Sequence, residues 1–191
     1  MARLLVTGFE PFDARGYNTS REILPALPAR IAGYELVSGV LPVSWERTAT
    51  ALGELVETFS PEVAVGLGMS QSPRIDLERI AVNFRTTERG DADGRYARGE
   101  LIEEQGALAL RSDLELEAVH AALTSAGHSA RISGSAGDYV CNLAFYTLSA
   151  MRRAGRLRKV GFIHVPPLEA HGGWPLEKIA RAVEIALSHA I

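Results

Sequence analysis

Three short, largely apolar runs constrain the fold of this chain most strongly. They read RLLVTG at 3–8, PEVAVGLGM at 61–69 and KVGFIHVP at 159–166. Runs of this length, bounded by glycine or proline, are typical of strands buried on both faces. Such strands need helices on each side of their sheet, so the runs predict a layered α/β fold.

Segments with helical periodicity alternate with these runs and with weaker strand candidates. We expect further strands at 34–43, 77–84 and 128–134, and helices at 21–27, 45–59, 113–127, 139–155 and 176–190. Strands separated by helices of this length favour parallel pairing. The sequence therefore predicts one domain over 1–191, a three-layer α/β/α sandwich around a mostly parallel sheet.

Residues that can begin a helix stand before several of these segments. The candidate caps are Asn18, Thr19 or Ser20 for the first helix, then Ser44, Asp113 and Asp138, with Pro175 at the start of the last helix. Two glycine-bearing polar stretches, 8–18 and 85–105, are expected to be loops. A loop as long as the second one is often functional in a compact domain.

Charge and hydropathy exclude several classes of protein. The formal net charge is −3, which favours neither nucleic acid nor an anionic membrane surface. No apolar run approaches the roughly 18 residues of a membrane span, and the N-terminal run is too short for a signal peptide. The single cysteine cannot form an intramolecular disulfide, so we expect a cytoplasmic protein. The sequence has no paired cysteines and its five histidines are scattered, so we expect no metal.

Cys141, the only cysteine, lies in SAGDYVCN at 135–142, near the start of a predicted helix. Free N–H groups at a helix start favour a thiolate, which suits a nucleophile. A buried cysteine that fills the core is an equally ordinary interpretation. Asp138 does not decide between these two interpretations. It could cap the helix, whereas its negative charge would oppose a thiolate.

His164 and Glu78 are candidate partners of that thiol. His164 ends a predicted central strand, and the carboxyl ends of such strands form the functional edge of an α/β sheet. An imidazole there could take the thiol proton, and a carboxylate such as Glu78 could orient the imidazole. Taken singly, His164 could instead be a hydrogen-bonded core residue, and Glu78 a surface residue paired with Arg79. The other four histidines are interpreted as surface residues.

Phe9 and Phe12 lie in the loop that follows the first predicted strand. Two rings in a loop either pack back onto the core or line an apolar pocket. The sequence leaves both alternatives open.

Four motifs together resemble those of the pyroglutamyl peptidase I family of cysteine peptidases. They are TGFEPF at 7–12, ERIAVN at 78–83, SAGDYVCN at 135–142 and GFIHVP at 161–166. They follow the order of the family's motifs with similar spacing across almost the whole chain. Asn18 and Ser20 also fall in the position of the family's N-P-S segment.

The resemblance implies an α/β/α fold and an enzyme that removes N-terminal pyroglutamate from peptides by thiol acyl transfer. It implies Cys141 as nucleophile, His164 as general base and Glu78 as orienting acid. The lactam ring would be held by Phe9, Phe12 and Tyr139, with Asn18 and Arg85 as further substrate-binding residues. It also implies no cofactor, and a homo-oligomer, either a dimer or a tetramer.

The sequence departs from the family's pattern in the loops. GLGMSQSPR at 66–74 replaces a glycine-rich turn, and FRTTERGDADGR at 84–95 lacks the family's P-D-N core. Arg85 and Arg89 are both candidates for the family's arginine in that stretch. Asp138 stands where the family has a small hydroxyl residue. These changes keep two alternatives open: a cysteine hydrolase with another amide or cyclic substrate, and a binding protein that has lost turnover.

Overall fold

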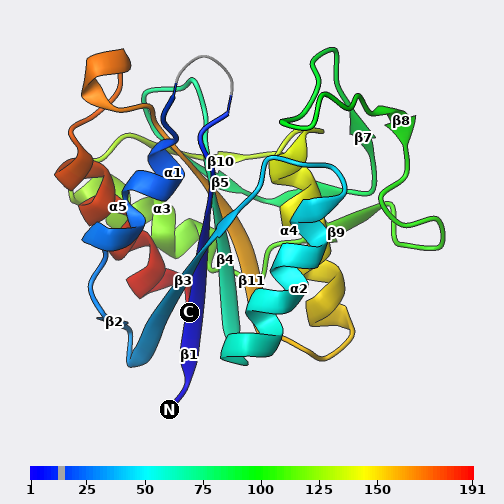
Figure 1. The fold of residues 1–191 in the computed structure, drawn as a ribbon. Helices are drawn as coiled ribbons and strands as arrows, with labels where there is room; N and C mark the ends of the chain where they lie inside the picture. The colour runs from blue at the N-terminus through cyan, green and yellow to red at the C-terminus, as the bar shows by residue number, and fades with distance from the viewer. Residues whose placement is uncertain (13–15) are drawn as a thin grey trace.

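A seven-stranded sheet forms the centre of the structure, a computed structural model that describes residues 1–12 and 16–191. Its middle strands run parallel in the order β11 (Lys159–Val165), β4 (Val63–Met69), β1 (Arg3–Phe9) and β3 (Tyr34–Leu41) (Figure 1). The three apolar runs form β1, β4 and β11, as predicted, and these strands lie side by side. Part of the predicted loop at 8–18, residues 13–15, lies outside the described residues.

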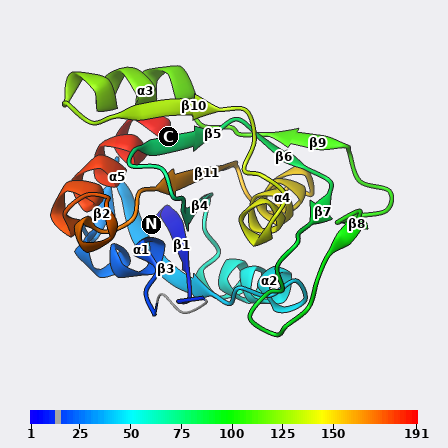
Figure 2. The same ribbon diagram turned by 90° about the horizontal axis from the view of Figure 1, so that it is seen from above.

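Helices cover both faces of this sheet (Figure 2). On one face lie α1 (Thr19–Glu22), α3 (Leu116–Ser125) and α5 (Leu176–Ala190), and on the other lie α2 (Arg47–Phe59) and α4 (Val140–Arg153). Val119 of α3 and Val183 of α5 belong to one apolar core, whereas Leu52 of α2 and Phe145 of α4 belong to the other. The predicted three-layer α/β/α architecture with a mostly parallel sheet is confirmed.

The outer strands depart from parallel pairing. The two-residue β2 (Arg30–Ile31) pairs antiparallel with β3, and β5 (Ile75–Glu78) pairs antiparallel with β11. Only residues 70–74 separate β4 from β5, too few for the crossover that a parallel return requires. Beyond β5, β10 (Ala130–Ser133) pairs with it in parallel.

The segment between β5 and α3 contains more strand than we predicted. The expected strand at 77–84 breaks after Glu78, and β6 (Ile80–Val82) pairs with β9 (Ala109–Arg111) outside the main sheet. Within the predicted loop at 85–105, β7 (Arg85–Thr86) pairs with β8 (Arg98–Glu100). Two small antiparallel ladders therefore hold this segment, residues 79–115, which we call the excursion. Its strands are too short to show a clear alternation of apolar and polar residues, so the sequence did not reveal them.

Two of the predicted helix caps form hydrogen bonds of the expected kind. The Asn18 side chain accepts from the Ser20 N–H at 3.2 Å and begins α1. The Ser44 hydroxyl accepts from the Arg47 N–H at 3.2 Å, at the start of α2. Pro25 falls within a short 3₁₀ helix at Leu24–Ala26 and ends the first helix early.

The predictions for Asp113 and Asp138 are wrong. α3 begins at Leu116 without a side-chain cap, and Asp113 instead accepts from the Val160 N–H and pairs with Arg152 at 2.9 Å. α4 also begins without a side-chain cap, next to Asp138. A cap needs an extended backbone at one specific position, which spacing alone does not fix.

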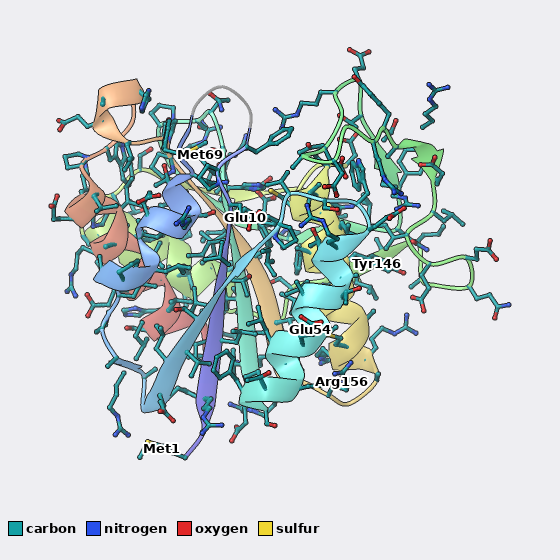
Figure 3. All side chains as sticks on the ribbon, viewed as in Figure 1. Met1, Glu10, Glu54, Met69, Tyr146 and Arg156 are labelled. Carbon is teal, nitrogen blue, oxygen red and sulfur yellow. The ribbon has the colours of Figure 1, made fainter. Side chains whose placement is uncertain are left out.

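The carboxyl ends of the central strands all reach one edge of the sheet, where α4 also begins (Figure 1). Glu10, just after β1, and Met69, at the end of β4, lie at this edge, whereas Met1 lies at the opposite end (Figure 3). Pro175 precedes α5 as expected. None of the helices in the described part of the chain is long and apolar enough to cross a membrane.

Candidate active site

Cys141 is the second residue of α4 and is half-buried at the functional edge of the sheet. Gly137 has φ +81° in the turn before the helix, a conformation that favours glycine. The neighbouring Asn142 is fully buried, and its amide bonds the Val82 N–H and C=O, both at 2.8 Å. These bonds fix the first turn of α4, and with it the thiol, against β6.

His164 lies one residue before the end of β11, and its ring contacts both of its predicted partners. The His164 Nδ1 lies 2.7 Å from Glu78 Oε1, and the side chains are only 13% and 3% exposed. On its other side, the ring lies close to the Cys141 sulfur, since Sγ and Nε2 both lie about 3 Å from the point that a Cβ at Gly68 would occupy. A carboxylate on Nδ1 orients the ring so that Nε2 faces the thiol. The structure therefore brings Cys141, His164 and Glu78 together, with the Glu78 carboxylate hydrogen-bonded to the imidazole and the thiol beside it.

Gly68 gives the reacting pair its space. It is the β4 residue paired in register with His164. A Cβ at Gly68 would lie 2.9 Å from the Cys141 Sγ and 3.0 Å from the His164 Nε2. A side chain there would force the thiol and the imidazole apart, so this site needs glycine for close approach of the backbone.

The surroundings of His164 favour its charged form. Burial on its own lowers the pKa of His164, but its interaction with the Cys141 sulfur and with the bonded Glu78 carboxylate outweighs this effect and raises the pKa to about 10. The imidazolium therefore persists through neutral pH beside the sulfur. A proton held on this ring is available to a leaving group close to the thiol.

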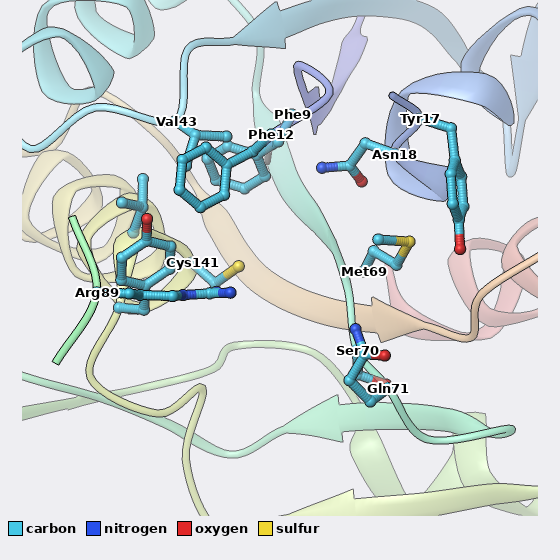
Figure 4. Close-up of a pocket in the computed structure, with 12 residues that line it drawn as sticks. Phe9, Phe12, Tyr17, Asn18, Val43, Met69, Ser70, Gln71, Arg89 and Cys141 are labelled. Carbon is cyan, nitrogen blue, oxygen red and sulfur yellow. The ribbon is translucent and has the colours of Figure 1, made fainter. Parts of the chain in front are cut away.

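A cavity of about 240 Å³ opens beside Cys141. At one end it is walled by aromatic and apolar side chains and one cation: Phe9, Phe12, Val43, Tyr139 and Arg89 (Figure 4). The Arg89 guanidinium carbon lies 4.4 Å from the centre of the Tyr139 ring and 5.5 Å from that of Phe12. This end can hold a flat, uncharged ring and offers a positive charge near the thiol.

The other end of the cavity is polar and thioether-lined. Tyr17, Asn18, Met69, Ser70 and Gln71 line it, across from the Phe9 and Phe12 rings (Figure 4). Asn18 is held in place because its amide donates to the Glu10 C=O at 3.1 Å. The Met69 sulfur accepts a hydrogen bond from the Thr19 hydroxyl at 3.3 Å.

The two candidate arginines occupy different places. Arg85 lies in β7, 3.8 Å from Glu100, and is not among the residues that line the cavity with Cys141. Arg89 is one of them. Phe9, Phe12, Tyr139 and Asn18 also line it, so the structure places every predicted site residue except Arg85 around one cavity or its thiol.

Asp91 holds the loop that carries Arg89, and our sequence analysis missed it. It is only 5% exposed, and its carboxylate accepts from the N–H groups of Trp45, Asp93 and Arg95 at 2.8–2.9 Å. The Trp45 ring in turn packs edge-on against Tyr139, with ring centres 5.2 Å apart. The D-x-D-G turn at 91–94 was the available signal, since aspartate commonly bonds backbone N–H groups in turns.

The remaining histidines and acids do not gather into a further centre. His171 and His189 are exposed as predicted, whereas His120 and His128 are half-buried. In the part of the chain that the structure describes, no group of three histidine, cysteine, aspartate or glutamate side chains could hold a metal ion.

The Gly68→Ala variant tests the close approach of β4 to the thiol. Alkylation of Cys141 by iodoacetamide at pH 7 is expected to slow roughly 10- to 100-fold, because the methyl group displaces the sulfur from the imidazolium. Gly53→Ala in α2 is the matched control, since its Cβ would meet only the Met151 methyl at 4.0 Å. It should keep the alkylation rate and gain about 0.5–1 kcal/mol in the free energy of unfolding. Equal rates in all three proteins would contradict the role of Gly68.

The protonation of His164 can be followed by ring ¹⁵N NMR. In the unmodified chain the ring should stay protonated as pH rises and lose its proton only near pH 10. In Cys141→Ala the largest contribution that raises the pKa is gone, so the proton should leave at a distinctly lower pH. Signals of the exposed His189 serve as an internal reference. The same titration curve in both proteins would show that the thiol and the imidazole do not interact.

Comparison with known proteins identifies the family of this chain. The family model for pyroglutamyl peptidase matches residues 2–191. A pyrrolidone-carboxylate peptidase of Thermococcus onnurineus is 34% identical, in an alignment that covers 97% of this chain and 96% of that protein. The resemblance drawn from the four motifs is thus confirmed.

Solved structures show the same fold. The crystal structure of pyrrolidone carboxyl peptidase from Thermus thermophilus superposes with a TM-score of 0.91 at 40% identity, covering 97% of this chain and 99% of that one. The Thermococcus litoralis structure gives 0.94 at 33% identity, covering 100% and 93%. The chain belongs to the pyroglutamyl peptidase family.

Proposed function

We propose that this chain is a cysteine exopeptidase that removes N-terminal pyroglutamate from peptides. The observation that carries the proposal is the hydrogen-bonded pair His164–Glu78 with the Cys141 thiol close to its imidazole, beside a small aromatic cavity. A cavity of about 240 Å³ suits a five-membered lactam better than a folded or extended peptide. Membership of the family supports the same substrate.

The first half of the reaction is acylation of the thiol. The Cys141 thiolate attacks the pyroglutamyl carbonyl carbon, and a C–S bond forms as the carbonyl electrons move to oxygen. When the tetrahedral intermediate collapses, the C–N bond breaks and the His164 imidazolium gives its proton to the leaving nitrogen. The peptide departs with a free amino group, and a thioester remains on Cys141.

The second half is hydrolysis of the thioester. Neutral His164 takes a proton from water, whose oxygen attacks the carbonyl carbon, and the C–S bond then breaks. Pyroglutamate leaves, and the thiolate–imidazolium pair returns. Glu78 orients the ring through Nδ1 and stabilises its positive charge.

The oxyanion is stabilised at the beginning of α4. The Cys141 N–H lies in the first turn of the helix and is available to the developing negative charge. The Arg89 guanidinium, held over Phe12 and Tyr139, adds positive charge on the ring-binding side. We assign this stabilisation of the oxyanion to Arg89, although Arg85 was also a candidate for the family's arginine.

The remaining expectations belong to this proposal. The substrates are peptides with N-terminal pyroglutamate, and the reaction needs no cofactor. A single reactive thiol suits the reducing cytoplasm. Assembly as a dimer or a tetramer stays a prediction.

Hydrolysis of a pyroglutamyl-coumarin amide tests the function, with Cys141→Ser as the near-isosteric blank. Turnover should occur in the unmodified chain and vanish in the blank, because serine gives no comparable nucleophile beside this histidine. No turnover, with Cys141 still rapidly alkylated at pH 7, would mean another amide or cyclic substrate. No turnover with an inert thiol would mean a binding protein.

Paired variants distinguish the two arginines. Arg89→Gln should lower kcat roughly 100-fold, since it removes a positive charge that lines the cavity beside the thiol. Arg85→Gln is the matched control, with the same side-chain change in the same excursion but outside the cavity, and should stay within about threefold of the unmodified kcat. Steady-state kinetics on the coumarin amide compare them. A larger loss of kcat in Arg85→Gln than in Arg89→Gln would assign stabilisation of the oxyanion to Arg85 instead.

A further inference from the structure

The cavity beside Cys141 has two ends of different character, and the proposed chemistry says which part of the substrate occupies each. Figure 4 shows Phe9, Phe12 and Arg89 on one side of the Cys141 sulfur and Tyr17 and Met69 on the other. The leaving nitrogen must lie near His164, because that residue supplies its proton. The end nearer His164 is therefore the end that receives the departing peptide.

The backbone of β4 identifies that end. Gly68 pairs with His164 and approaches both the thiol and the imidazole. Met69, Ser70 and Gln71 follow Gly68 directly and line the cavity. The Ser70 N–H donates to the Val165 C=O at 3.0 Å, which ties this segment to the residue next to His164.

Tyr17 forms the outer wall of the same end, and its ring is fixed by a stack. The rings of Tyr17 and His171 lie 4.1 Å apart between centres, with only 12° between their planes. Tyr17 comes from the segment before α1, and His171 from the 3₁₀ helix Glu169–His171 after β11. His171 is itself held, because its N–H donates to the Leu168 C=O at 2.8 Å.

The described lining of this end carries no charge. Tyr17 offers a ring, Met69 a thioether, and Asn18, Ser70 and Gln71 are neutral; the only charged lining residue among those described, Arg89, lies across the thiol. A carboxylate or ammonium group placed here would lose hydration without gaining an ionic partner from the described lining residues. An aromatic or large apolar side chain would gain contact with a fixed ring and a polarisable sulfur.

We propose that Tyr17, held by its stack on His171, and Met69 form the subsite for the first residue of the departing peptide and select an aromatic or large apolar side chain there. This inference rests on the proposed function and names its preferred substrates: pyroglutamyl peptides whose second residue is aromatic or large and apolar. Tyr17 is a specificity-determining residue in this scheme. It touches the departing side chain and does not take part in bond making.

The experiment compares kcat/KM for pyroglutamyl-Phe-amide, pyroglutamyl-Ala-amide and pyroglutamyl-Asp-amide. The unmodified chain should prefer Phe to Asp by at least roughly tenfold. Tyr17→Ala should reduce that preference about tenfold while changing the rate on the Ala substrate less than threefold. Tyr17→Phe keeps the ring face and should keep the preference, and His171→Ala should weaken it by freeing the ring. Tyr34→Ala is the remote control, because Tyr34 begins β3 and lies at the end of the sheet away from the cavity.

The outcomes separate this inference from the proposed function. If all three amides are hydrolysed but Tyr17→Ala keeps the Phe/Asp ratio, the subsite assignment is wrong and the peptidase assignment stands. A preference for Asp in the unmodified chain would also overturn it. If none of the three amides is hydrolysed, the proposed function fails and the subsite assignment fails with it.

Discussion

The antiparallel pairing of β5 with β11 is the constraint on which the site depends. It places Glu78, the last residue of β5, 2.7 Å from the Nδ1 of His164 and away from solvent. A carboxylate that is 2% exposed is costly unless a charge or strong donor pairs with it, and an imidazolium is such a partner. The imidazolium in turn is held by the sulfur on its other side. The contacts among Glu78, His164 and Cys141 thus offset part of the free-energy cost of burying their charges.

The central fold could be predicted from sequence because its signal is local. The runs in β1, β4 and β11 are apolar on both faces, and the segments between them have helical periodicity. The direction of β5 is another matter. The direction of β5 depends on the short connection at 70–74 and on the strand that lies beside β5 in space, which is β11. The sequence of the five connecting residues does not identify that neighbour. The two small ladders between β5 and α3 escaped for a similar reason, since strands of two or three residues carry no measurable alternation.

The site was only partly visible in the sequence. Cys141 and His164 could be singled out, because one begins a helix and the other ends a central strand, and both positions lie at the functional edge of such a sheet. Glu78 looked like a surface residue until the motif around it was considered. Gly68 and Asp91 went unnoticed. Gly68 matters because a Cβ there would touch the thiol and the imidazole, and Asp91 because its carboxylate joins its own turn to the distant Trp45 N–H. Such roles arise only when distant segments meet.

The two altered stretches of this chain, 66–74 and 84–95, do not carry the reacting groups. The thiol, imidazole and carboxylate are carried by α4, β11 and β5, whose positions are set by buried packing and by ladder hydrogen bonds. Beyond the end of β4, the altered stretches lie mostly in connections around the cavity, which tolerate replacement better than the elements that they join. Met69 and the Arg89 loop can therefore change which peptide fits while the distance between Cys141 and His164 stays fixed. In this architecture the strands and the helix start determine the reaction, and the loops determine the substrate.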